Sequence, residues 1–98
     1  MEIPSKFKIG GQEFKVEIVP TLLDSETEDE IYGCFSYTPP LIKLAKTVYG
    51  EEVPKNQMVS TFRHELIHCF QYMFEAETDE RLAQVFAGFL DEYEQSAE

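Results

Sequence analysis

The sequence predicts a single α+β domain over residues 1–98, in which a small, mainly antiparallel β-sheet precedes two helices. Three patterns predict this fold class. Residues 6–19 alternate apolar and polar side chains on either side of a Gly-Gly pair, residues 55–74 repeat apolar side chains at helical spacing, and residues 79–95 do so again. A chain of 98 residues suffices for one modest hydrophobic core and not for two, so we expect one domain.

The first predicted element is a β-hairpin over residues 6–19. Gly10-Gly11 is a typical hairpin turn, and Pro20 ends the second strand because proline has no N–H to donate to a neighbouring strand. On each strand the apolar side chains share one face, and these side chains are Phe7 and Ile9, then Phe14, Val16 and Ile18.

Two further short strands are predicted at residues 31–37 and 41–46. Gly33 suits a bulge or the close approach of another segment. An exposed strand edge can accept an extended peptide as an additional strand, so either strand is a candidate peptide-binding edge. Residues 24–30 hold five acids and no base, which predicts a solvated loop; their spacing does not fit a twelve-residue calcium loop.

The stretch Thr-Phe-Arg-His-Glu-Leu-Ile-His at residues 61–68 places a His-Glu-x-x-His motif inside the first predicted helix. Residues four apart lie one turn apart on the same helix face, so the imidazoles of His64 and His68 can bind one metal ion. Glu65 projects about 100° around the helix from His64, where it can accept a proton from a metal-bound water. The motif therefore predicts a zinc site with two histidine ligands and a general base.

The rest of this helix agrees with that interpretation. The chain has only two histidines, and both belong to the motif. Apolar side chains recur on the opposite face, namely Met58, Phe62, Leu66, Cys69 and Met73. Cys69 is therefore expected to be a small buried apolar residue, and Cys34 is the only other cysteine, so no disulfide framework is predicted.

A zinc peptidase site of this kind needs a third protein ligand, which is often a glutamate. Glu80 is our first candidate, and Asp79, Glu77 and Glu75 are alternatives. A negative charge in the first turn of the second helix would explain Glu80 equally well. In a tight antiparallel helix hairpin turning near residue 76, Gln84 and not Glu80 would lie level with the second histidine of the motif.

Composition excludes several classes of partner. A formal net charge of −11 disfavours nucleic acid and an anionic membrane surface, because both are bound by clustered Lys and Arg. The first residues lack the cationic segment and apolar run of a signal peptide, and no stretch approaches 18 apolar residues. We therefore expect a cytoplasmic location.

Two segments resemble a known family. They are residues 61–68, quoted above, and residues 80–90, Glu-Arg-Leu-Ala-Gln-Val-Phe-Ala-Gly-Phe-Leu. They look like the glutamate-zincin metallopeptidases, and within these the compact ImmA/IrrE-like proteins and similar short proteins of phages and mobile elements. In that family the HExxH helix is followed by a helix of the form Glu-x-x-Ala-Asn/Asp-x-Phe-Ala. Gln84 stands where the family usually has Asn or Asp.

The resemblance implies a minimal zincin-like domain in which His64, His68 and Glu80 bind Zn²⁺ and Glu65 is the general base. It also implies a peptide or protein substrate, and family members with a known role cleave repressors or other regulators. Tyr72 and the tyrosine at position 93 are candidates for stabilising the oxyanion.

The expected function is that of a zinc-dependent endopeptidase that hydrolyses peptide bonds with a metal-activated water. The alternative is a non-catalytic zinc-binding module, in which the metal stabilises a small core and the sheet edge binds a protein partner. A DNA-associated SprT-like activity is disfavoured by the acidic charge.

Overall fold

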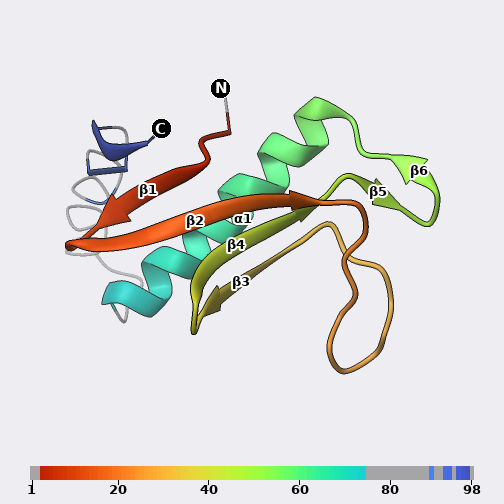
Figure 1. Ribbon diagram of the computed structural model, residues 1–98, viewed down its shortest axis with the longest axis horizontal. Coiled ribbons are helices and arrows are strands. Elements are labelled where there is room, and N and C mark those ends of the chain that lie inside the picture. Colours follow the sequence, from red (N-terminus) through yellow and green to blue (C-terminus); the bar gives the residue numbers. More distant parts are fainter. Residues whose placement is uncertain (1–2, 75–88, 90–91, 94, 98) are drawn as a thin grey trace.

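The computed structural model shows a four-stranded sheet with one long helix packed across one of its faces (Figure 1). It describes residues 3–74, 89, 92–93 and 95–97. The elements in chain order are β1 (Lys6–Ile9), β2 (Gln12–Val19), β3 (Gly33–Tyr37), β4 (Pro40–Ala45), β5 (Thr47–Val48), β6 (Glu51–Glu52) and α1 (Lys55–Phe74). The sheet is mixed but mostly antiparallel, which confirms the α+β class and the predicted order of sheet before helix.

The predicted hairpin is confirmed. β1 and β2 pair antiparallel with Phe7 opposite Phe14, and these two rings stack with centroids 5.4 Å apart. Gly10 and Gly11 have φ values of 57° and 80°, the left-handed conformation that both central residues of this turn type require. β2 ends at Val19, directly before Pro20.

The sheet order β1-β2-β4-β3 was not predicted in detail. β4 lies between β2 and β3, pairing parallel with the first and antiparallel with the second. Since both sides of β4 are paired, residues 41–46 cannot be the peptide-binding edge, and that alternative is wrong. β3 is one of the two strands that end the sheet, and its first residue, Gly33, lies against Thr61 of α1.

The core lies between the sheet and α1. It combines the apolar face of the hairpin and of β4 with the apolar stripe of α1 and with Phe89. Its large, fully buried side chains are Phe7, Ile9, Phe14, Ile42, Leu44, Phe62, Cys69 and Phe89. Burial raises the pKa of the Cys69 thiol to about 12, as expected of a cysteine that packs as an apolar residue.

Residues near the C-terminus close the other edge of the sheet. The backbone N–H of Lys8 donates to Ser96 Oγ at 2.8 Å, and the Ser96 hydroxyl donates to the Lys8 carbonyl at 3.0 Å. The Tyr93 ring contacts the Phe7 ring, with centroids 5.3 Å apart. Five of the described C-terminal residues are helical (89, 92, 93, 95 and 96), and the remainder of the predicted second helix lies outside the described residues.

The segment before α1 forms a small hairpin that the sequence pattern did not predict. β5 and β6 pair antiparallel as a small separate sheet, with Thr47 opposite Glu52. Tyr49 and Gly50, with φ values of 49° and 79°, form the turn between them. A Tyr-Gly pair is a weak hairpin signal compared with Asn-Gly, which explains why the sequence pattern missed it.

No helix in the described part of the chain is long and apolar enough to cross a membrane.

Gly33 permits the close approach of β3 to α1, as its position in the sequence predicted. A Cβ atom at Gly33 would lie 2.6 Å from Thr61 Cγ2 and 3.2 Å from Leu44 Cδ2. We therefore expect Gly33→Ala to lower the free energy of unfolding by about 1–3 kcal/mol, the usual range for overpacking, in urea denaturation.

The Thr61 methyl group provides the control for this prediction. Thr61→Ser removes Cγ2 but keeps the hydroxyl, which donates to the Gln57 carbonyl at 2.9 Å. The double variant Gly33→Ala/Thr61→Ser should therefore recover most of the stability lost in Gly33→Ala. Unchanged stability in the single variant would show that this close contact is unimportant.

Candidate metal centre and its cleft

The two histidines of the motif converge, as the sequence predicted. His64 Nε2 and His68 Nε2 lie 3.0 Å apart on the exposed side of α1, and their rings cross at 81°. Two zinc–nitrogen bonds of about 2.05 Å at a tetrahedral angle would place these atoms about 3.3 Å apart. The pair therefore fits two ligand positions of one zinc ion after a small opening of the side chains.

Gln71, which we did not predict as a site residue, orients one of these imidazoles. Its side-chain oxygen Oε1 lies 3.3 Å from His68 Nδ1. An amide oxygen only accepts hydrogen bonds, so a hydrogen bond here would need the proton on Nδ1, which would leave Nε2 of the neutral ring unprotonated. That is the tautomer a metal ligand requires. A glutamine three residues after the second histidine lies on the same helix face, which is the signal that could have identified it.

Glu65 occupies a different environment from the histidines. Its side chain is only 6% exposed, whereas both histidines are exposed. Burial raises the pKa of the Glu65 carboxyl, and the neighbouring His68 and His64 lower it in part. A carboxylate with a raised pKa is a stronger proton acceptor, as a general base needs to be.

The cleft beside Glu65 lies between α1 and the start of β3. It has a volume of about 330 Å³ and opens next to the histidine pair; its lining residues are Tyr32, Gly33, Gln57, Ser60, Thr61, His64 and Glu65. Most of these side chains are polar. The negative charge of Glu65 also adds to burial in raising the pKa of the Cys34 thiol, so this residue of β3 lies within the electrostatic range of the site.

The outer edge of β3 faces away from the sheet beside this cleft. The backbone N–H of Ala45 donates to the Tyr32 carbonyl at 2.8 Å. Because residues of an antiparallel strand alternate in direction, Cys34 and Ser36 also point toward β4, and the backbone groups of residues 33, 35 and 37 point outward. No strand in the described ranges pairs with these groups. They could accept an extended peptide, so residues 31–37 remain the candidate edge.

The two tyrosines suggested for the oxyanion have different surroundings. Tyr93 is buried in the core against Phe7 and Phe62, so that suggestion is wrong for Tyr93. Tyr72 is 54% exposed and its ring stacks on Tyr37 with centroids 4.3 Å apart. The Tyr72 ring therefore packs against the helix-facing side of β3.

No third candidate ligand accompanies the two histidines among the residues that the structure describes. Within those residues, no three histidine, cysteine, aspartate or glutamate side chains come together as a metal site. The predicted ligand Glu80 lies outside them, as do its alternatives Asp79, Glu77 and Glu75 and the neighbouring Gln84. The described residues thus provide two candidate ligands and the candidate base.

Comparison with known proteins adds no family assignment. No family model matches the chain, and no curated protein or solved structure matches it significantly.

The raised pKa of Glu65 predicts a pH-dependent stability in the metal-free protein. The folded state binds this proton more tightly than the unfolded state, so the stabilisation is fully present below the ordinary pKa of 4.5 and is lost as pH rises through the folded value. Glu65→Gln resembles the protonated form. We therefore expect it to raise the melting temperature of the metal-free protein at pH 7, with no difference from the wild type well below pH 4.5.

Asp24 provides a control of opposite sign. Its carboxylate accepts hydrogen bonds from the backbone N–H groups of Thr27 and Glu26, and these hold its pKa below the usual value of 3.8. Asp24→Asn should therefore lower the melting temperature at pH 7, and the difference should disappear as pH falls through the folded pKa. Shifts of the same sign in both variants would contradict the assignment for Glu65.

Proposed function

We propose that this protein is a zinc-dependent endopeptidase whose metal is held by His64 and His68. The observation that carries the proposal is the convergence of the two Nε2 atoms, 3.0 Å apart, beside the buried carboxylate of Glu65. Zinc bound at such a site would lower the pKa of a bound water to roughly 7 and polarise the carbonyl of the scissile bond. Glu80 is proposed as the third ligand by resemblance to the glutamate zincins.

Each described residue then has a definite role. The carboxylate of Glu65 removes a proton from the attacking water and later delivers it to the leaving nitrogen. A hydrogen bond from His68 Nδ1 to the Gln71 side-chain oxygen would hold His68 in the tautomer that leaves Nε2 available. His64 and Glu65 both line the cleft, so the base lies in the cleft beside one of the two ligands.

The substrate would be an extended peptide added to the outer edge of β3. The outward backbone groups of residues 33, 35 and 37 would bind its main chain, which requires no particular side chains in the substrate. The cleft at Gly33 and Glu65 lies directly beside this edge, so a peptide bond held there would be close to the base. A cytoplasmic location is proposed with this function.

Metal-dependent proteolysis tests the proposal. The purified protein should release fluorescent fragments from labelled casein, lose this activity when 1,10-phenanthroline removes the metal, and recover it when zinc is added back. A protein that binds zinc but never cleaves casein or a diverse peptide mixture would instead match the alternative function, a non-catalytic zinc-binding interaction module.

A further inference from the structure

Three aromatic side chains meet where α1 passes over the end of β3, and we call them the aromatic platform: Phe35, Tyr37 and Tyr72. The Tyr72 ring stacks on the Tyr37 ring with centroids 4.3 Å apart, and it meets the Phe35 ring edge-on with centroids 6.0 Å apart. Although Tyr37 covers one face of its ring, Tyr72 is 54% exposed. The platform therefore presents open ring surface that a further aromatic group can contact.

The platform lies on the same side of α1 as the candidate site. A rotation of about 100° per residue places Glu65, His68 and Tyr72 within about 60° of one another around the helix. Gly33, the first residue of β3, lines the cleft with Glu65, and Tyr37, the last residue of β3, stacks on Tyr72. β3 thus runs beside α1 from the candidate site to the platform.

The unpaired backbone groups of β3 determine where a bound peptide would place its side chains. Antiparallel pairing is the more stable arrangement, and residues directly opposite each other then carry their side chains on the same face, with Cβ atoms about 5 Å apart. The side chains of Phe35 and Tyr37 lie on the face that α1 covers. A peptide residue opposite Phe35 would therefore place its side chain beside the Tyr72 ring. The residue opposite Gly33, two positions later in the peptide, would lie at the cleft.

We propose that the aromatic platform binds an aromatic side chain of the peptide substrate, two or three residues before the scissile bond. This inference rests on the proposed peptidase function and names its substrate class. A phenylalanine, tyrosine or tryptophan side chain can stack on or meet the open part of the Tyr72 ring, and such aromatic pairs are stabilised beyond the burial of their area. A small side chain would bury little apolar surface there, and a charged one would lose hydration.

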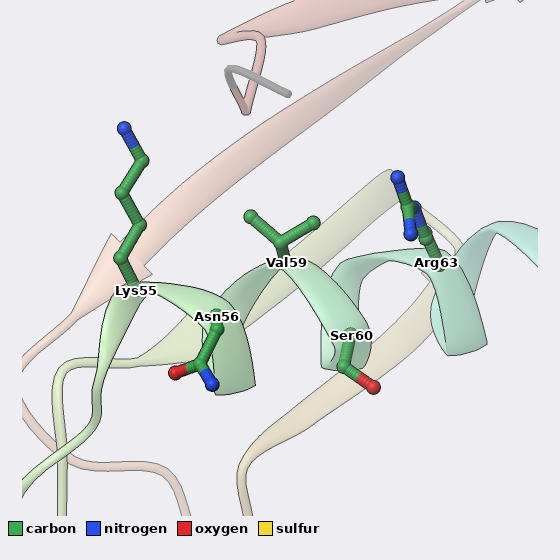
Figure 2. A pocket seen from close by; sticks show the side chains of 5 residues that line it. All are labelled: Lys55, Asn56, Val59, Ser60 and Arg63. Atoms are coloured by element: carbon green, nitrogen blue, oxygen red, sulfur yellow. The ribbon is translucent and has the colours of Figure 1, made fainter.

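A hollow elsewhere on α1 is a rival site for such a side chain. It has a volume of about 530 Å³, and Figure 2 shows the side chains that line it, Lys55, Asn56, Val59, Ser60 and Arg63. Val59 is the only apolar side chain among these five, and none of them is aromatic. Val59 also projects about 140° around the helix from Tyr72, so the hollow and the platform lie on different flanks of α1. An aromatic side chain should prefer the platform.

Binding is tested first without catalysis. Two short peptides, capped at both ends and identical except for phenylalanine or alanine at one central position, are titrated into the ¹⁵N-labelled chain with EDTA present, and amide shifts are followed by NMR. The phenylalanine peptide should shift the amides of residues 35, 37 and 72 and bind about three- to tenfold more tightly than the alanine peptide. Tyr72→Ala should remove this difference, and Tyr72→Phe should keep it because the ring is retained.

Ile67 provides the matched control. It is another large apolar residue of α1, 46% exposed, but it projects about 140° around the helix from Tyr72, so Ile67→Ala should leave binding unchanged. A capped single phenylalanine cannot form a strand and should bind far more weakly than the peptide.

Several outcomes of the titration would overturn the inference. They are equal binding of the two peptides to the wild type, a preference for phenylalanine that survives Tyr72→Ala, shifts at the hollow of Figure 2 in place of the platform, and a capped phenylalanine that binds as tightly as the peptide. Platform shifts that grow with protein concentration alone would also overturn it, because a second copy would then occupy the platform. The wild-type comparison needs no variant, so it decides the inference even if Tyr72→Ala fails to fold.

Cleavage then tests the substrate class. In a mixture of proteome-derived peptides, bonds cut by the wild type should be enriched in Phe, Tyr and Trp two or three residues before the bond. Tyr72→Ala should remove this enrichment, and Ile67→Ala should keep it. Cleavage without aromatic enrichment contradicts this inference and leaves the peptidase function intact. A complete lack of cleavage contradicts the proposed function, and the NMR titration still decides whether the platform binds an aromatic side chain.

Discussion

Glu65→Gln should abolish peptide cleavage while leaving zinc bound. The glutamine has nearly the same size, so the fold and the positions of His64 and His68 should be kept, but the amide cannot accept the proton of the attacking water. Loss of a general base typically lowers the rate by about 10²- to 10⁴-fold. The measurement is the turnover rate on labelled peptide beside zinc content per chain.

Glu92 offers a matched control for this substitution. It is an exposed carboxylate whose Oε1 atom accepts a hydrogen bond from the Gly10 N–H at 3.1 Å, on the edge of the sheet that carries β1. Glu92→Gln should keep both zinc and turnover. If Glu65→Gln keeps turnover as well, the carboxylate is not the base; if it loses zinc, the carboxylate is needed to hold the metal.

Phe7→Ala should destabilise the protein more than any other single change considered above. The Phe7 side chain is fully buried, stacks on Phe14, and meets the rings of Phe62 and Tyr93 edge-on, so it joins the hairpin, α1 and the C-terminal residues. Removing a buried phenylalanine side chain typically lowers the free energy of unfolding by about 3–5 kcal/mol. Small domains have total stabilities of only about 5–15 kcal/mol.

Urea denaturation of the metal-free protein measures this loss directly. Ile18 serves as the control because it lies on the same sheet but its side chain is 53% exposed, so Ile18→Ala should change the stability little. Comparable losses in both variants would mean that the core is not centred on Phe7.

Local patterns predicted the elements of this fold better than their arrangement. The hairpin follows from Gly10-Gly11 and alternation, and α1 from the recurrence of apolar residues between Lys55 and Phe74. The parallel pairing of β2 with β4 places Lys15 opposite Leu41, although a long segment that includes β3 separates them in the chain, and no local residue pattern specifies such a contact. The main determinant of this pairing is the burial of both faces of β4, and these faces are buried only in the assembled sheet.

For the candidate site too, the sequence predicted local features better than the arrangement of distant segments. Helical spacing alone brings His64 and His68 together, because residues four apart share a face. The burial of Glu65 was not foreseen from that spacing, since it depends on how closely β3 approaches α1 at Gly33.

Zinc content per chain is the measurement that tests the central claim most directly. The protein purified with zinc supplied should contain about one zinc per chain by elemental analysis, as a single site of this geometry implies. His64→Ala, His68→Ala and Glu80→Ala should each lose most of it, and Lys15→Gln should keep it. A wild-type protein without zinc after zinc has been supplied, or one whose zinc survives both histidine substitutions, would contradict a metal centre on α1.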